Sequence, residues 1–133
     1  MGFFIKIGAM TFMSTTNPLL LALKEKGCTV DETLAETLMG NEMLYERLLK
    51  KKLPVLQCVD KMAAALAAGD AAACFEAGHE IKGVYASLGL KPLLVICNEI
   101  VETTRKGELT GVAEKLPALK ALHDEILEII AKY

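Results

Sequence analysis

A chain of 133 residues with 53% hydrophobic and only 5% aromatic residues can bury one core, and this composition favours helices over a sheet. Its formal net charge of −2 provides no basic field for nucleic acid, so we expect partners to be recognised locally. The four cysteines show neither a C-x-x-C pair nor zinc-ligand spacing, which predicts reduced thiols in a cytoplasmic protein and no metal site: Cys28, Cys58, Cys74 and Cys97.

Residues 1–16 are an apolar N-terminal extension whose role the sequence does not identify. The run MGFFIKIGAMTFM is interrupted by Lys6 and two glycines, is too short to cross a bilayer and lacks a convincing secretory signal. Met10 and Met13 leave open a later start of translation. We expect no membrane association and a segment that packs on its own bundle or on a second copy. The chain is therefore expected to be a monomer, with a weak homodimer through the N-terminus as the alternative.

Two short helices are expected at the start of a single helical domain of residues 17–133. Asn17 caps the first helix, which stops at Gly27. Asp31 caps the second, which ends at Gly40. Both are expected to cover one end of a helical bundle.

Four longer helices follow these two. The first is expected from Asn41 to about Ala68 with a bend at Pro54, although a break into two helices is the alternative. The others are expected at 71–88, 91–105 and from about 110 or 112 to 132. Because their connections are only a few residues long, neighbouring helices must run antiparallel. The predicted fold is all-α: an antiparallel up-down-up-down four-helix bundle with the short N-terminal helices capping one end.

The stretch from Ala71 to Leu90 predicts a helix with two different faces. At about 100° per residue, the apolar face consists of Cys74, Ala77, Ile81, Val84, Tyr85 and Leu88. His79 lies on the opposite face, where its neighbours are Ala72, Phe75, Glu76, Lys82, Gly83 and Ala86. The imidazole is therefore expected in water, with a cation one turn along the helix and mostly small residues beside it.

Two glycines in this helix need a reason, because each costs about 1 kcal/mol relative to alanine. They are Gly78 and Gly83. Gly83, one turn from His79, would let a bulky group approach closely, and Lys82 could meet an anion held on the imidazole. A solvated polar face with two incidental glycines is the ordinary alternative.

The sequence from His79 to Gly83, HEIKG, followed by small residues and by Leu-Gly-Leu at 88–90, resembles the H-x-x-K-G signature of histidine-containing phosphotransfer (Hpt) domains. The resemblance extends from about Lys24 to the C-terminus. In that family the histidine carries a phosphoryl group between aspartates of response-regulator receiver domains. It implies that His79 is phosphorylated, through Nε2, and that Lys82 and Gly83 belong to the same site. It also implies that the receiver supplies the divalent metal, so this chain is expected to need no cofactor.

Two positions depart from the family pattern. Residues 50–52 are three lysines where the family often has an aromatic residue, so that contact is made by Leu53 or is missing. Glu80 stands where members often carry a small or hydroxyl residue, and at about 100° around the helix it is expected to point past the site.

Four residues are predicted to dock the partner: Phe75, Glu76, Ala86 and Arg105. Phe75 would provide an apolar anchor, or alternatively fill a groove of the bundle. Glu76 could orient the imidazole through a ring N–H or repel phosphate. Arg105 matches a basic position that approaches the phosphoryl group in some Hpt domains, although a cation at a helix C-terminus is the ordinary alternative. His123, which lies among apolar residues, is expected to be packed and serves as a control.

The sequence therefore predicts a phosphorelay intermediate, not an enzyme, because no nucleotide-binding motif is present. His79 would take a phosphoryl group from a receiver aspartate and pass it to another response regulator, with receiver domains and a hybrid sensor kinase as partners. One alternative is a non-phosphorylated helical-bundle adaptor that binds receiver domains or other signalling partners. A cofactor-binding bundle is a weaker alternative, because the helices contain no Glu-x-x-His pairs.

Overall fold

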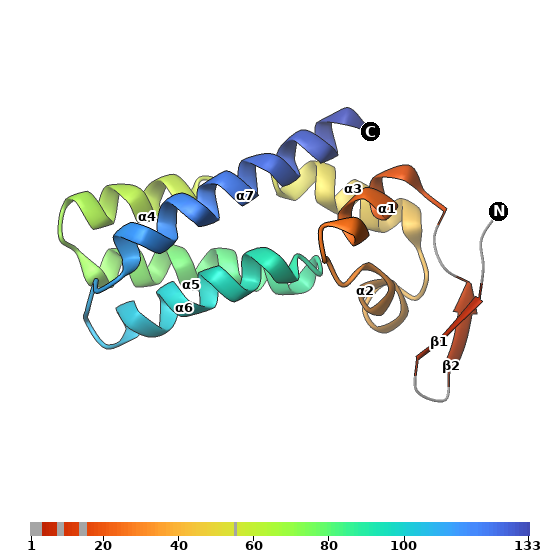
Figure 1. Cartoon of the computed structure of the whole chain (residues 1–133), viewed down its shortest axis with the longest axis horizontal. Coiled ribbons are helices and arrows are strands. Elements are labelled where there is room, and N and C mark those ends of the chain that lie inside the picture. The colour runs from red at the N-terminus through yellow and green to blue at the C-terminus, as the bar shows by residue number, and fades with distance from the viewer. Residues whose placement is uncertain (1–3, 8–9, 14–15, 55) are drawn as a thin grey trace.

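The computed structural model describes residues 4–7, 10–13, 16–54 and 56–133 (Figure 1). In these residues two strands precede seven helices: β1 (Phe4–Ile7), β2 (Met10–Met13), α1 (Pro18–Glu25), α2 (Val30–Glu36), α3 (Glu42–Lys52), α4 (Cys58–Ala67), α5 (Ala71–Ser87), α6 (Lys91–Arg105) and α7 (Val112–Lys132). The strands pair antiparallel as a hairpin, within the apolar N-terminal extension whose role the sequence did not identify. The predicted helical bundle is confirmed, and the hairpin is an addition to it.

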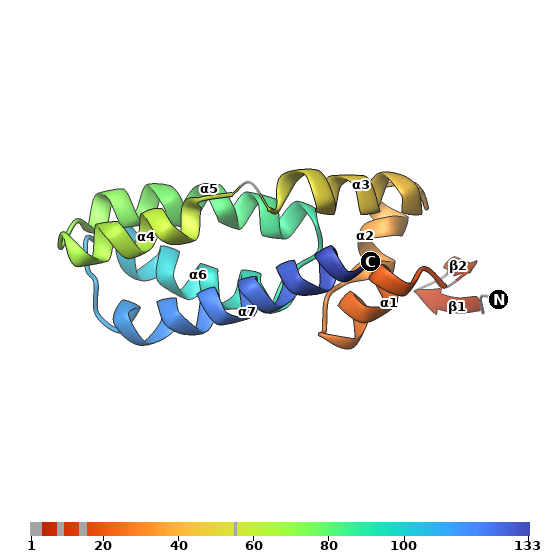
Figure 2. The ribbon, with the colours of Figure 1, turned by 90° about the horizontal axis from the view of Figure 1, so that it is seen from above.

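Helices α4, α5, α6 and α7 lie side by side with their axes roughly aligned (Figures 1 and 2). α5 packs between α4 and α6, and α7 packs on α6 and α4. Buried apolar side chains from all seven helices form one core. No described helix combines the length and the apolarity that crossing a bilayer requires.

The helix expected over residues 41–68 is two helices, α3 and α4, so the break that the sequence left as an alternative is what the chain adopts. Pro54 lies in the connection between α3 and α4, and it has no amide donor for the hydrogen bond that a continuous helix would make there. Leu53, the preceding residue, is fully buried in the core. It therefore makes an apolar contact next to the three lysines that stand where the family often has an aromatic residue.

Helices α1 and α2 lie at the end of the bundle where α5 turns into α6 (Figures 1 and 2). The amide of Thr29 donates to the carbonyl of Gly89 at 2.8 Å, and the Tyr45 hydroxyl donates to the carbonyl of Leu88. Gly89 has a φ of +69°, and a Cβ there would lie 2.2 Å from Thr33 Oγ1. Only glycine therefore fits this turn, which joins the N-terminal helices to the end of α5.

Most of the predicted helix starts are confirmed, with one correction. The Asn17 side chain accepts from backbone amides at the start of α1, and the Asp70 side chain does the same for α5. Asp31 does not cap α2: Thr29 occupies the N-cap position, and Asp31 is buried in the first turn in an ion pair with Lys24. The ion pair gives the buried carboxylate of Asp31 a partner of opposite charge.

Candidate functional site

His79 lies near the middle of the 17-residue helix α5, and its side chain is exposed. The opposite face of α5 is buried in the core, as predicted, through Cys74, Ala77, Ile81, Tyr85 and the following Leu88, with Val84 half-buried. A helix whose backbone is fixed on one side by the core therefore presents the imidazole to solvent on the other.

The imidazole of His79 stacks on the ring of Phe75, one turn earlier in α5. The two ring centroids are 5.6 Å apart and the ring planes differ by 16°. The guanidinium of Arg105, at the end of α6, lies over the same Phe75 ring at 5.2 Å from its centroid. Arg105 Nε also pairs with Glu102 Oε1 at 3.5 Å. The packing of α5 on α6 thus brings His79, Phe75 and Arg105 together, and we call these three residues the stacked group.

The sequence named all three members of the stacked group and placed Phe75 beside His79, but it predicted neither the ring stack nor the contact of Arg105 with Phe75. The spacing of Phe75 and His79, four residues apart on a helix, is a signal that could have indicated the stack. The contact with Arg105 depends on how α5 and α6 pair, and the sequence pattern does not contain that information.

The two glycines of α5 have different surroundings. A Cβ at Gly78 would lie 3.1 Å from Val101 Cγ2 and 3.3 Å from Met62 Sδ, so this glycine allows close packing of α5 between α4 and α6. Gly83 is exposed, and a Cβ there would meet nothing within 4 Å. Packing therefore explains Gly78, whereas Gly83 leaves an open surface one turn from His79.

Lys82 is half-buried, and it forms no ion pair with a carboxylate of the described residues. Its ammonium group is available to an anion that approaches the same face of α5. Ala86, two turns after His79, is exposed and adds no bulk to that face. The part of the site toward the C-terminus of α5 therefore has little side-chain bulk and carries one cation, Lys82.

On the other side of the site is a hollow of about 350 Å³ between α5 and α6. It is lined by Ala72, Phe75, Glu76, Thr104, Arg105 and Gly107. Glu76 is exposed there, and no hydrogen bond joins its carboxylate to His79 in the described part of the chain. Glu80 accepts a hydrogen bond from the Cys58 thiol at 3.5 Å, so it faces α4 and points past the site as predicted.

His123, the control residue, is buried with an exposed fraction of 4%. Its Nδ1 lies 2.7 Å from the Tyr85 hydroxyl oxygen, in a hydrogen bond between α7 and α5. Burial lowers the pKa of His123 and raises the pKa of Tyr85. The prediction of a packed histidine is confirmed.

The cysteines are poor candidates for the nucleophile. All four are buried and free. Burial raises the pKa of Cys28 to about 11 and that of Cys97 to about 12, so these thiols stay protonated near neutral pH. Within the described residues, no three His, Cys, Asp or Glu side chains are grouped so that they could hold a metal ion.

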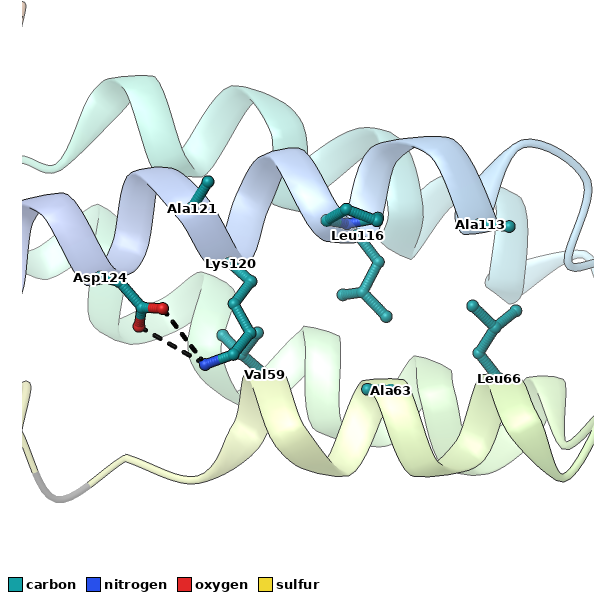
Figure 3. Close-up of a pocket in the computed structure, with 9 residues that line it drawn as sticks. Val59, Ala63, Leu66, Ala113, Leu116, Lys120, Ala121 and Asp124 are labelled. Atoms are coloured by element: carbon teal, nitrogen blue, oxygen red, sulfur yellow. Dashed lines mark hydrogen bonds and ion pairs between the residues drawn. The ribbon is translucent and has the colours of Figure 1, made fainter.

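A second hollow, of about 540 Å³, lies between α4 and α7 (Figure 3). Apolar side chains line most of it, and Lys120 pairs with Asp124 at 3.4 Å on its border. The residues that line it are Val59, Ala63, Leu66, Ala113, Leu116, Pro117, Lys120, Ala121 and Asp124. None of the predicted site residues is among them. This hollow is therefore separate from the surface around His79.

Comparison with known proteins gives one match. The family model described as Hpt domain matches residues 55–129, which is more than half of the chain and includes α4, α5, α6 and most of α7. No curated protein and no solved structure matches the chain. The matched segment contains His79, Lys82 and Gly83, the residues that form the exposed face of α5. The chain therefore belongs to the Hpt domain family, the histidine phosphotransfer domains of phosphorelays.

Proposed function

We propose that His79 accepts a phosphoryl group from the aspartyl phosphate of one receiver domain and passes it to the aspartate of another. One observation carries this assignment: an exposed imidazole stands at the middle of α5, inside the segment that matches the Hpt family. The other candidate nucleophiles are buried, namely the thiols and His123. This chain acts as a carrier and contributes no kinase activity.

The transfer exchanges one bond to phosphorus for another. The lone pair of His79 Nε2 forms the P–N bond while the P–O bond to the receiver aspartate breaks, and the aspartate leaves as a carboxylate with the bonding electrons. Nδ1 keeps its proton. The attacking nitrogen uses a lone pair that carries no proton, so this step needs no separate base. The reverse sequence of bond changes delivers the group to the next receiver.

Lys82 and Gly83 assist from the same face of the helix. The phosphoryl group adds negative charge, and the ammonium of Lys82, three residues after His79, neutralises part of it. The open surface at Gly83 lets the receiver backbone and the phosphoryl group come close to the imidazole. The divalent metal of the reaction is expected on the receiver, so this chain needs no cofactor of its own.

The receiver docks on the exposed surface around His79 that includes Phe75, Glu76, Ala86 and Arg105. The hollow between α5 and α6 is a depression in this surface into which a side chain of the receiver could fit. Arg105 and Glu76, which have opposite charges, lie in its lining. A hybrid sensor kinase that carries a receiver domain is the expected source of the phosphoryl group. We expect a monomer, with a weak homodimer through the N-terminal extension as the alternative.

Residues 17–133 constitute the Hpt unit in this proposal, and residues 1–16 are an extension to it. The connections between consecutive helices from α4 to α7 are short, which supports an antiparallel up-down-up-down order of these four helices. Helices α1 and α2 then cap the end of the bundle at Gly89.

The test is phosphoryl transfer from a receiver domain labelled at its aspartate. The wild-type chain should take up acid-labile label and return it to a second receiver, whereas His79→Gln should remain at background. His123→Gln is the matched control: it keeps a side chain that can bond to Tyr85 and should be labelled like the wild type. Labelling of His79→Gln at the wild-type level would refute the assignment. Receiver binding without labelling of the wild-type chain would instead indicate the adaptor.

A further inference from the structure

We infer that Phe75 is a positioning residue for the phosphoryl transfer: its ring fixes the plane of the His79 imidazole and so directs Nε2 toward the phosphorus atom. This inference deepens the proposed function and rests on it. The proposed docking role places Phe75 against the receiver. The positioning role places it against the histidine of its own chain.

The contacts of His79 carry the first step. The structure gives the imidazole no hydrogen bond to another described residue, and its ring contact is the stack on Phe75. An exposed histidine without a hydrogen bond exchanges rapidly among its allowed rotamers. A neighbouring ring 5.6 Å away and tilted by only 16° restricts that rotation, because offset parallel stacking is one of the favoured arrangements of two such rings.

The geometry of the lone pair carries the second step. The Nε2 lone pair of imidazole lies in the plane of the ring, so the plane sets the direction in which the P–N bond forms. Phe75 lies nearly parallel to this plane in a stacked arrangement, so its ring constrains the plane from the side and not along the in-plane direction of the lone pair. Transfer between two oxygen or nitrogen atoms requires an in-line arrangement, and small errors of placement slow it strongly.

The support of Phe75 carries the third step. Its side chain is half-buried and packs on the core, which limits the motion of its ring. The Arg105 guanidinium lies over that ring, and Glu102 pairs with Arg105. The orientation of the imidazole is therefore linked to α6 through the stacked group, while the backbone of His79 is set by α5.

Kinetics distinguish positioning from docking. A docking residue changes the receiver concentration at which the transfer rate is half-maximal, whereas a positioning residue changes the maximal rate. Single-turnover transfer from a phosphorylated receiver to the full-length chain should be measured over a range of receiver concentrations. We expect Phe75→Leu to lower the maximal rate about three- to tenfold, the range that the loss of one aromatic pair produces, whereas the loss of a docking contact would appear separately as a higher half-saturating concentration.

Two variants provide the controls. Phe75→Tyr keeps a ring of the same shape and should restore the maximal rate to within about twofold of the wild type. Leu122→Ala removes a half-buried apolar side chain from α7 and should leave both kinetic parameters unchanged, although it weakens the fold. If Phe75→Leu changes only the half-saturating concentration, or leaves both parameters unchanged, Phe75 has no positioning role.

A spectroscopic measurement tests the stack without any transfer. In the wild-type chain the ring protons of His79 should show an upfield ring-current shift from Phe75, which Phe75→Leu should remove and Phe75→Tyr should keep. Equal shifts in the wild type and in Phe75→Leu would refute the positioning role even if transfer occurs. If the wild-type chain takes no label, the relay function and the positioning role fall together. If it is labelled but Phe75→Leu matches its maximal rate, only the positioning role falls.

Discussion

The two histidines of this chain have similar neighbours and different surroundings. His79 lies 5.6 Å from the ring of Phe75, and His123 lies 5.9 Å from the ring of Tyr85, measured between centroids. The first pair is on the exposed face of α5, and the second is inside the bundle, where the Tyr85 hydroxyl bonds to Nδ1 of the imidazole.

In the proposed function, access to solvent, not an aromatic neighbour, separates the two histidines. A phosphoryl group on His123 would place a dianion among buried apolar side chains, which is strongly unfavourable without paired cations. The same group on His79 stays in water near Lys82. The stability of the fold should therefore depend on His123 and the chemistry on His79.

The largest expected effect on stability comes from His123→Ala. This change opens a cavity in the core and leaves the buried Tyr85 hydroxyl without a partner, so we expect the free energy of unfolding to fall by about 3 kcal/mol. His79→Ala on the exposed face should change it by less than about 0.5 kcal/mol. Urea unfolding followed by circular dichroism measures both. Equal losses in the two variants would contradict the division of roles between the two histidines.

The next largest effect is expected from Tyr85→Phe. The variant keeps the ring and removes only the hydroxyl, so Nδ1 of His123 loses its hydrogen-bond partner inside the core. A buried polar group without a partner costs about 1 to 2 kcal/mol, and the urea midpoint should fall accordingly. Phe75→Leu, a larger change at the surface pair, should cost less. A Tyr85→Phe chain as stable as the wild type would show that this hydrogen bond contributes nothing.

Periodicity was sufficient to predict the two faces of α5. The alternation of apolar and polar residues at helical spacing separates Tyr85 from His79, and the caps at Asn17 and Asp70 follow from local chemistry. These features depend on residues close in sequence. The exposed histidine, its cation and the open glycine could therefore be predicted without a structure.

Features that depend on how helices pair could not be predicted in the same way. The sequence gives Gly78 and Gly83 the same pattern, and only the packing of Val101 and Met62 against Gly78 distinguishes them. The cation of Arg105 reaches Phe75 only because α6 packs on α5 as it does. Pro54 allowed either a bend or a break in the helix, and the chain adopts the break between α3 and α4.

The pH dependence of stability should also report on His123. Burial lowers the pKa of this imidazole in the fold, the Asp124 and Asp60 carboxylates oppose that shift, and Lys120 reinforces it. The unfolded chain therefore binds a proton near pH 6.5 before the folded chain does, so the free energy of unfolding should fall as the pH drops below about 6.5. We expect the urea midpoint to fall progressively between pH 7 and pH 5.5.

The matched control for this pH dependence is His123→Gln. In this variant the fall in the free energy of unfolding between pH 7 and pH 5.5 should disappear. Urea midpoints at half-unit steps of pH measure it. A wild-type curve that is flat between pH 7 and pH 5.5, or one that the variant reproduces, would show that His123 does not resist protonation in the fold.

The smallest effect, and the one of opposite sign, is expected at Gly83. Gly83→Ala adds a methyl group in open space on a helix, so the free energy of unfolding should rise by about 0.5 to 1 kcal/mol. If the open surface serves the approach of a receiver, the same variant should transfer phosphoryl more slowly although its fold is stronger. Gly78→Ala is the matched control, because its Cβ would press on Val101 and cancel the gain in helix propensity. A Gly83→Ala chain that is both more stable and unimpaired in transfer would show that this glycine is an incidental surface residue. Of the two residues proposed to assist His79, only Lys82 would then remain.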